Sequence, residues 1–154
     1  MNALETKIPP PLAGLICGAL AWFASYAAAN PTAIAFPIRL TAALALVVLG
    51  FSIALAGVRA VLRAKTTLNP IKLETSSALV TSGIYHYTRN PMYLGMATWL
   101  LAWSAWVGTP VGLLGPALFM LYMNRFQIGP EERALNKLFG TEFAAYLTRV
   151  RRWL

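Results

Sequence analysis

Three long stretches without a charged residue constrain this chain more than any other feature. Lys7 and Arg39 enclose 31 uncharged residues, Arg39 and Arg59 enclose 19, and Arg89 and Arg125 enclose 35. A helix needs about 20 apolar residues to cross the hydrocarbon core of a bilayer. The first two stretches are therefore each long enough for one membrane span, and the third is long enough for two.

The composition agrees with a membrane protein. Of the 154 residues, 58% are hydrophobic and only 12% are charged, whereas a soluble domain carries about 25% charged residues to keep its surface solvated. This balance excludes a disordered chain and argues against a soluble enzyme or a nucleic-acid-binding module. The length is that of one domain. We therefore expect a single all-α, polytopic integral membrane domain over residues 1–154.

Turn signals divide the uncharged stretches into four spans. Asn30-Pro31 ends the first stretch, and Gly108-Thr109-Pro110 splits the third where a tight turn is expected. The expected transmembrane helices cover residues 12–29, 38–62, 91–107 and 110–128.

The positive charges predict the orientation of these spans. Twelve of the thirteen Lys and Arg residues would lie on one side of the membrane, and only Arg39 on the other. By the positive-inside rule that side is the cytoplasm, so both termini and the loop 63–90 are expected there, in the cell (inner) membrane. The net charge of +8 then faces anionic lipid headgroups, and no nucleic-acid partner is expected.

A cytoplasmic amphipathic helical segment is predicted over residues 130–150. Gly129-Pro130 followed by two glutamates is typical of a helix start, and Gly140-Thr141 predicts a break. Apolar residues then follow at three- and four-residue steps and would form one stripe. These residues are Leu135, Leu138, Phe139, Phe143, Tyr146, Leu147 and Val150.

Acidic residues are scarce, with five Glu and no Asp in the sequence. Two of them, Glu131 and Glu132, are adjacent at the end of the fourth span. Spacing alone favours a structural interpretation, in which the acids interact with a helix dipole. The functional interpretation is a site for a cation at the membrane surface. Asn124 would share a helical face with Glu131, and polar groups at this depth favour a polar pocket.

A second polar group precedes the third span. Arg89 on its own is typical of an arginine that extends its charge to the membrane surface. Asn90-Pro91 predicts a helix start, with the Asn90 side chain accepting a hydrogen bond from the first turn. His86, the one histidine in the sequence, is a weaker candidate for a base than for a headgroup contact. Cys17 is the one cysteine, and no metal site is expected.

Taken together, two segments resemble a known enzyme family. The run SGIYHYTRNPMYLG at residues 82–95 and the run PEERALNKLFGTEFAAYLTRVRRWL at residues 130–154 resemble the isoprenylcysteine carboxyl methyltransferases. These are integral membrane enzymes that use S-adenosylmethionine and are related to phospholipid methyltransferases. No single piece is specific, but the ordered combination is. Asn90 departs from the histidine that precedes the proline in the eukaryotic enzymes, and the amino-terminal half is shorter than theirs.

This resemblance implies methyl transfer from S-adenosylmethionine at the cytoplasmic membrane face. The acceptor would be the carboxylate of an isoprenylcysteine-like or other hydrophobic substrate. Partners would then be a lipophilic small molecule or lipid-modified substrate and membrane lipids, and a homo-oligomer is an open alternative. The implied catalytic residues are Arg89 and Asn124, and the implied cofactor-binding residues are Tyr85, His86, Asn90, Pro91, Tyr93, Leu94, Gly95, Glu131 and Glu132.

Other functions stay open at the level of sequence. A carboxylate acceptor needs no general base, whereas a phospholipid amine or a thiol would need one, for which His86, Glu131 and Tyr93 are the candidates. An NADPH-dependent enzyme similar to the membrane sterol reductases would need several cations around its cofactor, but the sequence offers paired acids. A non-enzymatic membrane adaptor would use the glutamates only as solubilising charge.

Overall fold

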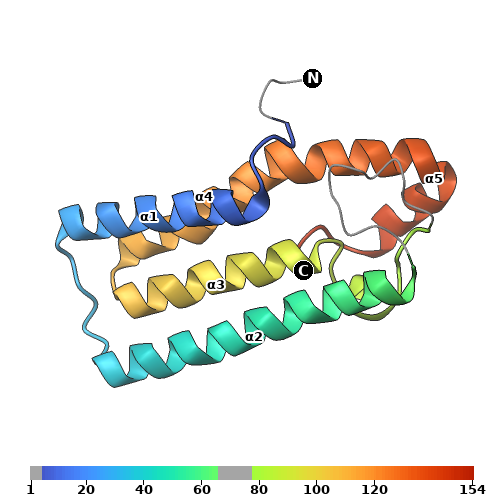
Figure 1. The fold of residues 1–154 in the computed structure, drawn as a ribbon. Coiled ribbons are helices and arrows are strands. Elements are labelled where there is room, and N and C mark those ends of the chain that lie inside the picture. Colours follow the sequence, from blue (N-terminus) through green and yellow to red (C-terminus); the bar gives the residue numbers. More distant parts are fainter. Residues whose placement is uncertain (1–4, 66–77) are drawn as a thin grey trace.

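The computed structural model describes residues 5–65 and 78–154, and every regular element in these two ranges is helical (Figure 1). The all-α prediction is thus confirmed. The longer elements are α-helices, η2 and η3 are single 3₁₀ turns, and η4 is a π-helical turn. The bounds are α1 Pro10–Ala28, α2 Phe36–Arg63, η2 Gly83–His86, α3 Pro91–Val107, η3 Pro110–Leu113, α4 Leu114–Tyr122, η4 Met123–Ile128 and α5 Gly129–Arg149.

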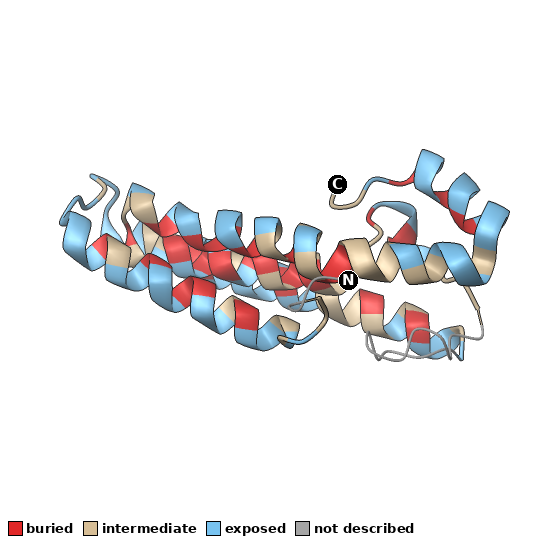
Figure 2. Cartoon of the chain, turned by 90° about the horizontal axis from the view of Figure 1, so that it is seen from above, coloured by how far each residue is buried: buried red, intermediate tan, exposed pale blue. Residues whose placement is uncertain are grey.

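Two helices are long and apolar enough to cross a membrane. These are α1, with 19 residues, and α2, with 28 residues, and they agree with the predicted spans 12–29 and 38–62 to within about two residues. More than half of the residues of α2 are exposed, as expected for a helix that faces lipid. Exposed residues also cover much of the outer surface of the bundle (Figure 2). Helix α3 has the predicted bounds 91–107, and η3, α4 and η4 together occupy 110–128. That all four segments cross a bilayer stays a prediction.

Helix α3 lies in the middle of the bundle (Figure 1). It packs against α2 on one side and against α1 and α4 on the other, and α4 also packs on α1. Phe119 and Met123 of the fourth segment are completely enclosed. The buried core that joins α1, α3 and α4 consists of Ala13, Cys17, Tyr93, Ala97, Leu100, Phe119, Met123 and Ile128.

Two glycines allow α2 and α3 to approach at backbone distance. A Cβ atom placed on Gly95 would lie 2.6 Å from the carbonyl oxygen of Gly50 and 2.9 Å from Cβ of Ala54. A Cβ atom on Gly50 would lie 2.8 Å from the carbonyl oxygen of Gly95. All three distances are shorter than a nonbonded carbon contact permits, so this crossing requires small residues. Gly95 therefore has a packing role here, in addition to the cofactor role that the resemblance implies for it.

Replacing Gly95 by alanine is expected to lower the free energy of unfolding by about 1–3 kcal/mol, because the added methyl group forces the two backbones apart. Gly14→Ala is the matched control, since its Cβ would meet only Phe119 at an ordinary 3.8 Å. Thermal unfolding in detergent measures both. Equal stability of the Gly95 variant and the wild type would show that α2 and α3 do not pack at this distance.

The chain passes from α4 into α5 without leaving the helical conformation. Gly129 begins α5, as predicted, but its backbone is helical and its N–H donates to the carbonyl of Asn124, five residues back. Pro130 has no N–H to donate to the carbonyl of Phe126. That carbonyl instead accepts from the backbone N–H of Thr6 at 3.0 Å. The glutamates that follow therefore do not face a free helix N-terminus, and the structural explanation for their pairing loses its basis.

Helix α5 bends sharply at Gly140, which has φ 47° and ψ −116°, and the predicted break at this glycine is confirmed. The second half folds back towards the bundle (Figure 1). The predicted single stripe is only partly formed, since Leu138 and Leu147 are exposed. The remaining apolar residues form a second small core, made by Phe143, Tyr146 and Val150 against Leu79, Leu135 and Phe139.

Candidate functional site

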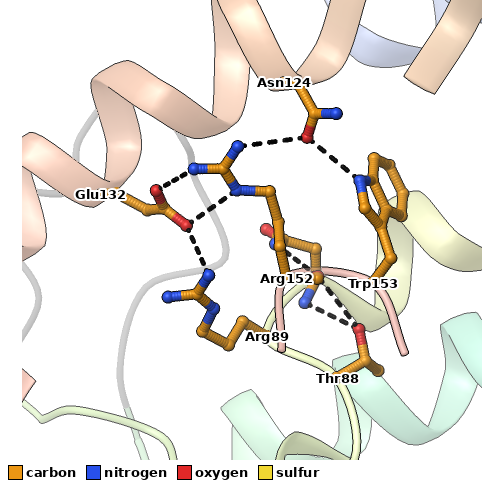
Figure 3. A network of polar contacts seen from close by, with 7 residues as sticks. Thr88, Arg89, Asn124, Glu132, Arg152 and Trp153 are labelled. Atoms are coloured by element: carbon orange, nitrogen blue, oxygen red, sulfur yellow. Dashed lines mark hydrogen bonds and ion pairs between the residues drawn. The ribbon is translucent and has the colours of Figure 1, made fainter. Parts of the chain in front are cut away.

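Three segments that are distant in the sequence meet at one end of the bundle, which we call the site end. They are the residues before and at the start of α3, the junction of η4 with α5, and the last residues of the chain. The carboxyl terminus lies beside the start of α3 (Figure 1). Figure 3 shows the polar network that these segments form. The sequence predicted the first two segments as parts of one site, and the structure brings them together.

Glu132 is held by two arginines. Its Oε1 lies 3.3 Å from Nη2 of Arg89 and accepts a hydrogen bond of 3.1 Å from Nε of Arg152. Its Oε2 pairs with Nη2 of Arg152. The Arg152 guanidinium therefore binds the carboxylate through two parallel N–H groups, which is the strongest arrangement for such a pair. Glu132 is thus neutralised by the protein itself.

Asn124 binds the carboxyl-terminal segment. Its Oδ1 accepts from the indole Nε1 of Trp153 at 3.0 Å and from Nη1 of Arg152 at 3.4 Å (Figure 3). The sequence predicted that Asn124 shares a helical face with Glu131, whereas these contacts connect Asn124 to Glu132, through Arg152. In this state its oxygen is engaged by the protein, so the catalytic role implied for it stays a prediction.

The predicted cap at Asn90 is wrong. Asn90 does precede α3, but its side chain forms no capping hydrogen bond with the first turn of this helix. The Asn90 amide instead donates to the backbone carbonyl of Arg152 at 3.0 Å, and the Thr88 hydroxyl donates to the same carbonyl at 3.3 Å. The backbone N–H of Arg89 donates to the carbonyl of Arg151. Tertiary contacts with the end of the chain therefore replace the local cap.

Glu131 has a different environment from Glu132. Its Oε1 accepts two short hydrogen bonds of 2.6 Å, one from the hydroxyl of Tyr93 and one from the side-chain amide of Gln127. Both donors are neutral. Burial raises the pKa of the Glu131 carboxyl to about 7, although the bonds from Tyr93 and Gln127 lower it. This carboxylate is thus partly buried, and it forms no ion pair within the described residues.

Two further tyrosines lie at the site end. Tyr85 is buried in η2, and its backbone carbonyl accepts from the hydroxyl of Tyr146 at 2.7 Å. Burial raises the pKa of the Tyr85 phenol, and the nearby Tyr146 and Glu131 raise it further. Burial also raises the pKa of Tyr146, to about 12. Both phenols are therefore neutral hydrogen-bond donors at physiological pH.

The other predicted residues are spread around this network. Pro91 is buried where α3 packs on Gly57 of α2, and Leu94 is half-buried in the first turn of α3. His86 is exposed at the end of η2. The structure thus brings Tyr85, Tyr93 and Glu131 together, and it brings Arg89, Asn90, Asn124 and Glu132 together through the carboxyl-terminal segment. It does not gather His86 or Gly95 into either group.

Sequence reasoning missed the most connected residue of the network. Arg152 was one of many cations assigned to topology, and Trp153 had no assigned role. Nothing in the spacing of the sequence shows that the chain returns from α5 to the start of α3. A usable signal was the polar and aromatic end Arg151-Arg152-Trp153 after an apolar stripe, since a tryptophan indole needs a partner when it is buried.

The amino-terminal segment covers the same junction from outside. Glu5 pairs with Arg133 at 2.9 Å and with Arg125 at 3.4 Å. A third glutamate, besides Glu131 and Glu132, therefore lies near the start of α5. No cluster of three or more His, Cys or Glu side chains that could hold a metal occurs within residues 5–65 and 78–154.

Comparison with known proteins identifies relatives of this chain. A family model described as "Phospholipid methyltransferase" matches residues 38–142. An uncharacterized protein of Haemophilus influenzae is 46% identical over 63 residues, which are 41% of this chain and the whole of that protein. Protein-S-isoprenylcysteine O-methyltransferase B of Arabidopsis thaliana is 30% identical over 88 residues, which are 57% of this chain and 45% of that enzyme.

A further relative is Protein-S-isoprenylcysteine O-methyltransferase of Saccharomyces cerevisiae, 32% identical over 85 residues, which are 51% of this chain and 33% of that enzyme. The chain therefore spans less than half the length of these two enzymes. No solved structure matches it. The family model covers more than half of the chain and includes nearly all of α2, the whole of α3, the glutamate pair and most of α5. This chain therefore belongs to the phospholipid methyltransferase family of membrane methyltransferases, and it is related to the isoprenylcysteine O-methyltransferases.

Proposed function

We propose that this protein transfers a methyl group from S-adenosylmethionine to a lipophilic acceptor, at the site end of the bundle. One observation carries the proposal. Glu131 is a partly buried carboxylate whose hydrogen bonds among the described residues come only from neutral groups, Tyr93 and Gln127. Keeping such a carboxylate ionised without a countercharge is costly unless a cation binds it, and S-adenosylmethionine is a cation.

The residues around Glu131 fit the other groups of this cofactor. The start of α3 has no side-chain cap, so its first-turn amides are available to the cofactor carboxylate, as at other anion-binding helix starts. Beside this helix start, Nε of Arg89 is buried and has no hydrogen-bond partner within the described residues, so it can donate to an anionic group of a bound ligand. When bound, S-adenosylmethionine supplies an electrophilic methyl group on a sulfonium centre.

We assign the protein's own contribution to charge, position and exclusion of water. Glu131 would offset the positive charge of the cofactor, while Tyr93 and Gln127 hold the carboxylate in place. Arg89 would orient an anionic acceptor, since a guanidinium binds a carboxylate or phosphate through two parallel hydrogen bonds. The carboxyl-terminal segment contacts this network through Arg152 and Trp153 and would limit the access of water to it. Rate enhancement would then come mainly from orientation in an enclosed pocket.

We infer the topology from the same features. Four spans at 12–29, 38–62, 91–107 and 110–128, with both termini in the cytoplasm, place the site end at the cytoplasmic headgroups, because the basic residues concentrate there. The exposed apolar surface of α2 then faces lipid and gives a hydrophobic acceptor a route to the site. A carboxylate acceptor needs no base. An amine or thiol acceptor would give up a proton, and a Glu131 carboxyl that titrates near neutral pH could take it.

The test is methyl transfer by the purified protein. In lipid nanodiscs with S-adenosylmethionine labelled in its methyl group, we expect label to enter one lipophilic product of a host lipid extract. Binding of the cofactor and its demethylated product is measured separately by calorimetry. Absence of binding of both at millimolar concentration would refute the proposal. Binding without transfer would place the missing acceptor outside the extract, and a panel of hydrophobic carboxylates, amines and thiols would then identify its class.

A further inference from the structure

The opposite end of the bundle, which we call the far end, carries a cavity that the proposed function does not use. Its lining on α3 begins about 15 Å from the start of this helix, because Leu101 lies ten residues after Pro91 and each residue adds about 1.5 Å. The cavity has a volume of about 470 Å³, within the range of pockets of roughly 300–1,000 Å³ that bind small ligands. Its walls come from α2, α3 and η3 and are almost wholly apolar, including Ile38, Leu46, Leu101 and Leu113.

Arg39 is the one charged residue in the lining of this cavity. Its Nη1 donates to the carbonyls of Val107 at 3.1 Å and Trp106 at 3.3 Å, so part of its role is to bind the C-terminal carbonyls of α3. Gly108 makes room for it, since a Cβ atom there would collide with Nη1. The guanidinium is therefore seated in a place shaped for it.

Some N–H groups of the Arg39 guanidinium donate no hydrogen bond to the described part of the chain. In the part of the chain that the structure describes, both hydrogen bonds of Arg39 come from Nη1, and Nε is buried without a partner. The hydroxyl of Thr32, which lines the same cavity, is also buried without a partner. The edge formed by Nε and Nη2 is the one with which arginine binds two oxygens of a phosphate or carboxylate.

The surroundings of Arg39 indicate a lipid headgroup region. Trp22, Trp103 and Trp106 pack together at the far end, with ring centroids 5.0 to 5.6 Å apart, and each is more than a third exposed. Tryptophans concentrate at the level of the headgroups. A ligand at this place would therefore have its polar group at the membrane surface and its apolar part against α2 and α3.

We propose that the cavity at the far end binds one anionic phospholipid. The phosphate accepts hydrogen bonds from Nε and Nη2 of Arg39 and from the Thr32 hydroxyl, and an acyl chain follows the apolar wall past Ile38 and Leu46. The charge of the phosphate complements the single cation of the cavity, and its oxygens satisfy both orphaned donors. This site is independent of methyl transfer, because it lies at the other end of the bundle.

Native mass spectrometry of the protein released from micelles tests this proposal. The micelles contain phosphatidylglycerol and phosphatidylcholine with identical acyl chains. We expect the wild type to retain one phosphatidylglycerol more tightly than phosphatidylcholine. Arg39→Gln is expected to weaken that binding about tenfold, as the loss of charge-assisted hydrogen bonds predicts. Arg59→Gln, which changes the same charge at an exposed position near the other end of α2, is the control and should retain the lipid.

Two further variants keep the test independent of folding defects. Ala42→Phe fills the cavity without altering Arg39 and should exclude the lipid. Thr32→Val removes one hydrogen-bond donor and should weaken the binding of phosphatidylglycerol several-fold. Equal retention of both lipids by the wild type would overturn the proposal, as would tight retention by Arg39→Gln or by Ala42→Phe. Displacement of the phospholipid by an equimolar fatty acid would also overturn it, since the occupant would then be a free carboxylate.

Discussion

Replacing Glu131 by glutamine is expected to reduce the affinity for S-adenosylmethionine at least tenfold and to remove its dependence on pH. The wild-type carboxyl has a pKa raised to about 7 by burial, so in the free protein it is largely protonated below neutral pH. A bound cation favours the ionised form. Binding must therefore release a proton at acidic pH, and the observed affinity rises as the pH rises towards 7.

The size of this effect follows from the fraction of Glu131 that is ionised. Between pH 5.5 and 7.0 that fraction increases on the order of tenfold, and the affinity should increase by the same factor. The α-amino group of the cofactor, with a pKa of about 7.7–8.0, stays protonated throughout this window. Calorimetry in two buffers of different ionisation enthalpy measures the affinity and the proton release together.

The free energy of unfolding should fall as the pH rises, whereas the affinity for the cofactor rises. The folded pKa of Glu131, about 7, lies above the ordinary value of 4.5, so the unfolded chain loses its proton first as the pH rises. The free energy of unfolding therefore falls between pH 4.5 and pH 7. Glu131→Gln removes this penalty and should be at least as stable as the wild type at pH 8, so that lost binding cannot be ascribed to misfolding.

Glu142→Gln is the matched control for Glu131→Gln. Glu142 lies on the same helix but is exposed, and its replacement should leave both the affinity and the pH profile unchanged. If Glu131→Gln binds S-adenosylmethionine as the wild type does, with the same pH dependence, Glu131 does not hold the cofactor.

The helices were predictable because the sequence marks their ends. Charged residues, prolines and glycines border the apolar stretches, and the helices end within about two residues of those marks. The close crossing at Gly50 and Gly95 was harder to predict, because a glycine in an apolar helix is also compatible with a binding site. The backbone bond from Thr6 to Phe126 could not be predicted, since it joins segments that no local rule relates.

The candidate site was predictable in part, because an unusual pair of residues marks it in the sequence. Adjacent glutamates in a chain with few acids predicted a polar site, and the structure brings the segment that contains Arg89 to them. The sequence could not separate the roles of the two acids, because neighbouring residues on a helix point in different directions and meet different partners. Glu131 meets neutral donors, whereas Glu132 meets two arginines. Arg152 contributes to this difference, and it contacts Glu132 only because the end of the chain folds back onto the start of α5.

Glu132→Gln is expected to act on stability where Glu131→Gln acts on binding. It leaves the guanidinium of Arg89, whose side chain is 14% exposed, and that of Arg152, which is 35% exposed, without their shared carboxylate. Removing one partner of a fully buried pair costs about 3–5 kcal/mol. Since Arg152 is partly solvated, we expect a loss of about 2 kcal/mol in the free energy of unfolding.

The local consequence should be release of the carboxyl-terminal segment. Trypsin must bind the Arg152 side chain to cleave after it, and Glu132 holds that side chain, so cleavage after Arg152 should be faster in Glu132→Gln than in the wild type. Adding Arg152→Met to Glu132→Gln removes one of the two unpaired charges, and the double variant should lose less stability than the two single changes sum to. Additive effects, with unchanged trypsin cleavage in Glu132→Gln, would mean that the ion pair does not anchor the end of the chain. The two adjacent glutamates would then differ only in solvation, and the enclosure of the site would have to come from the apolar contacts of α5 alone.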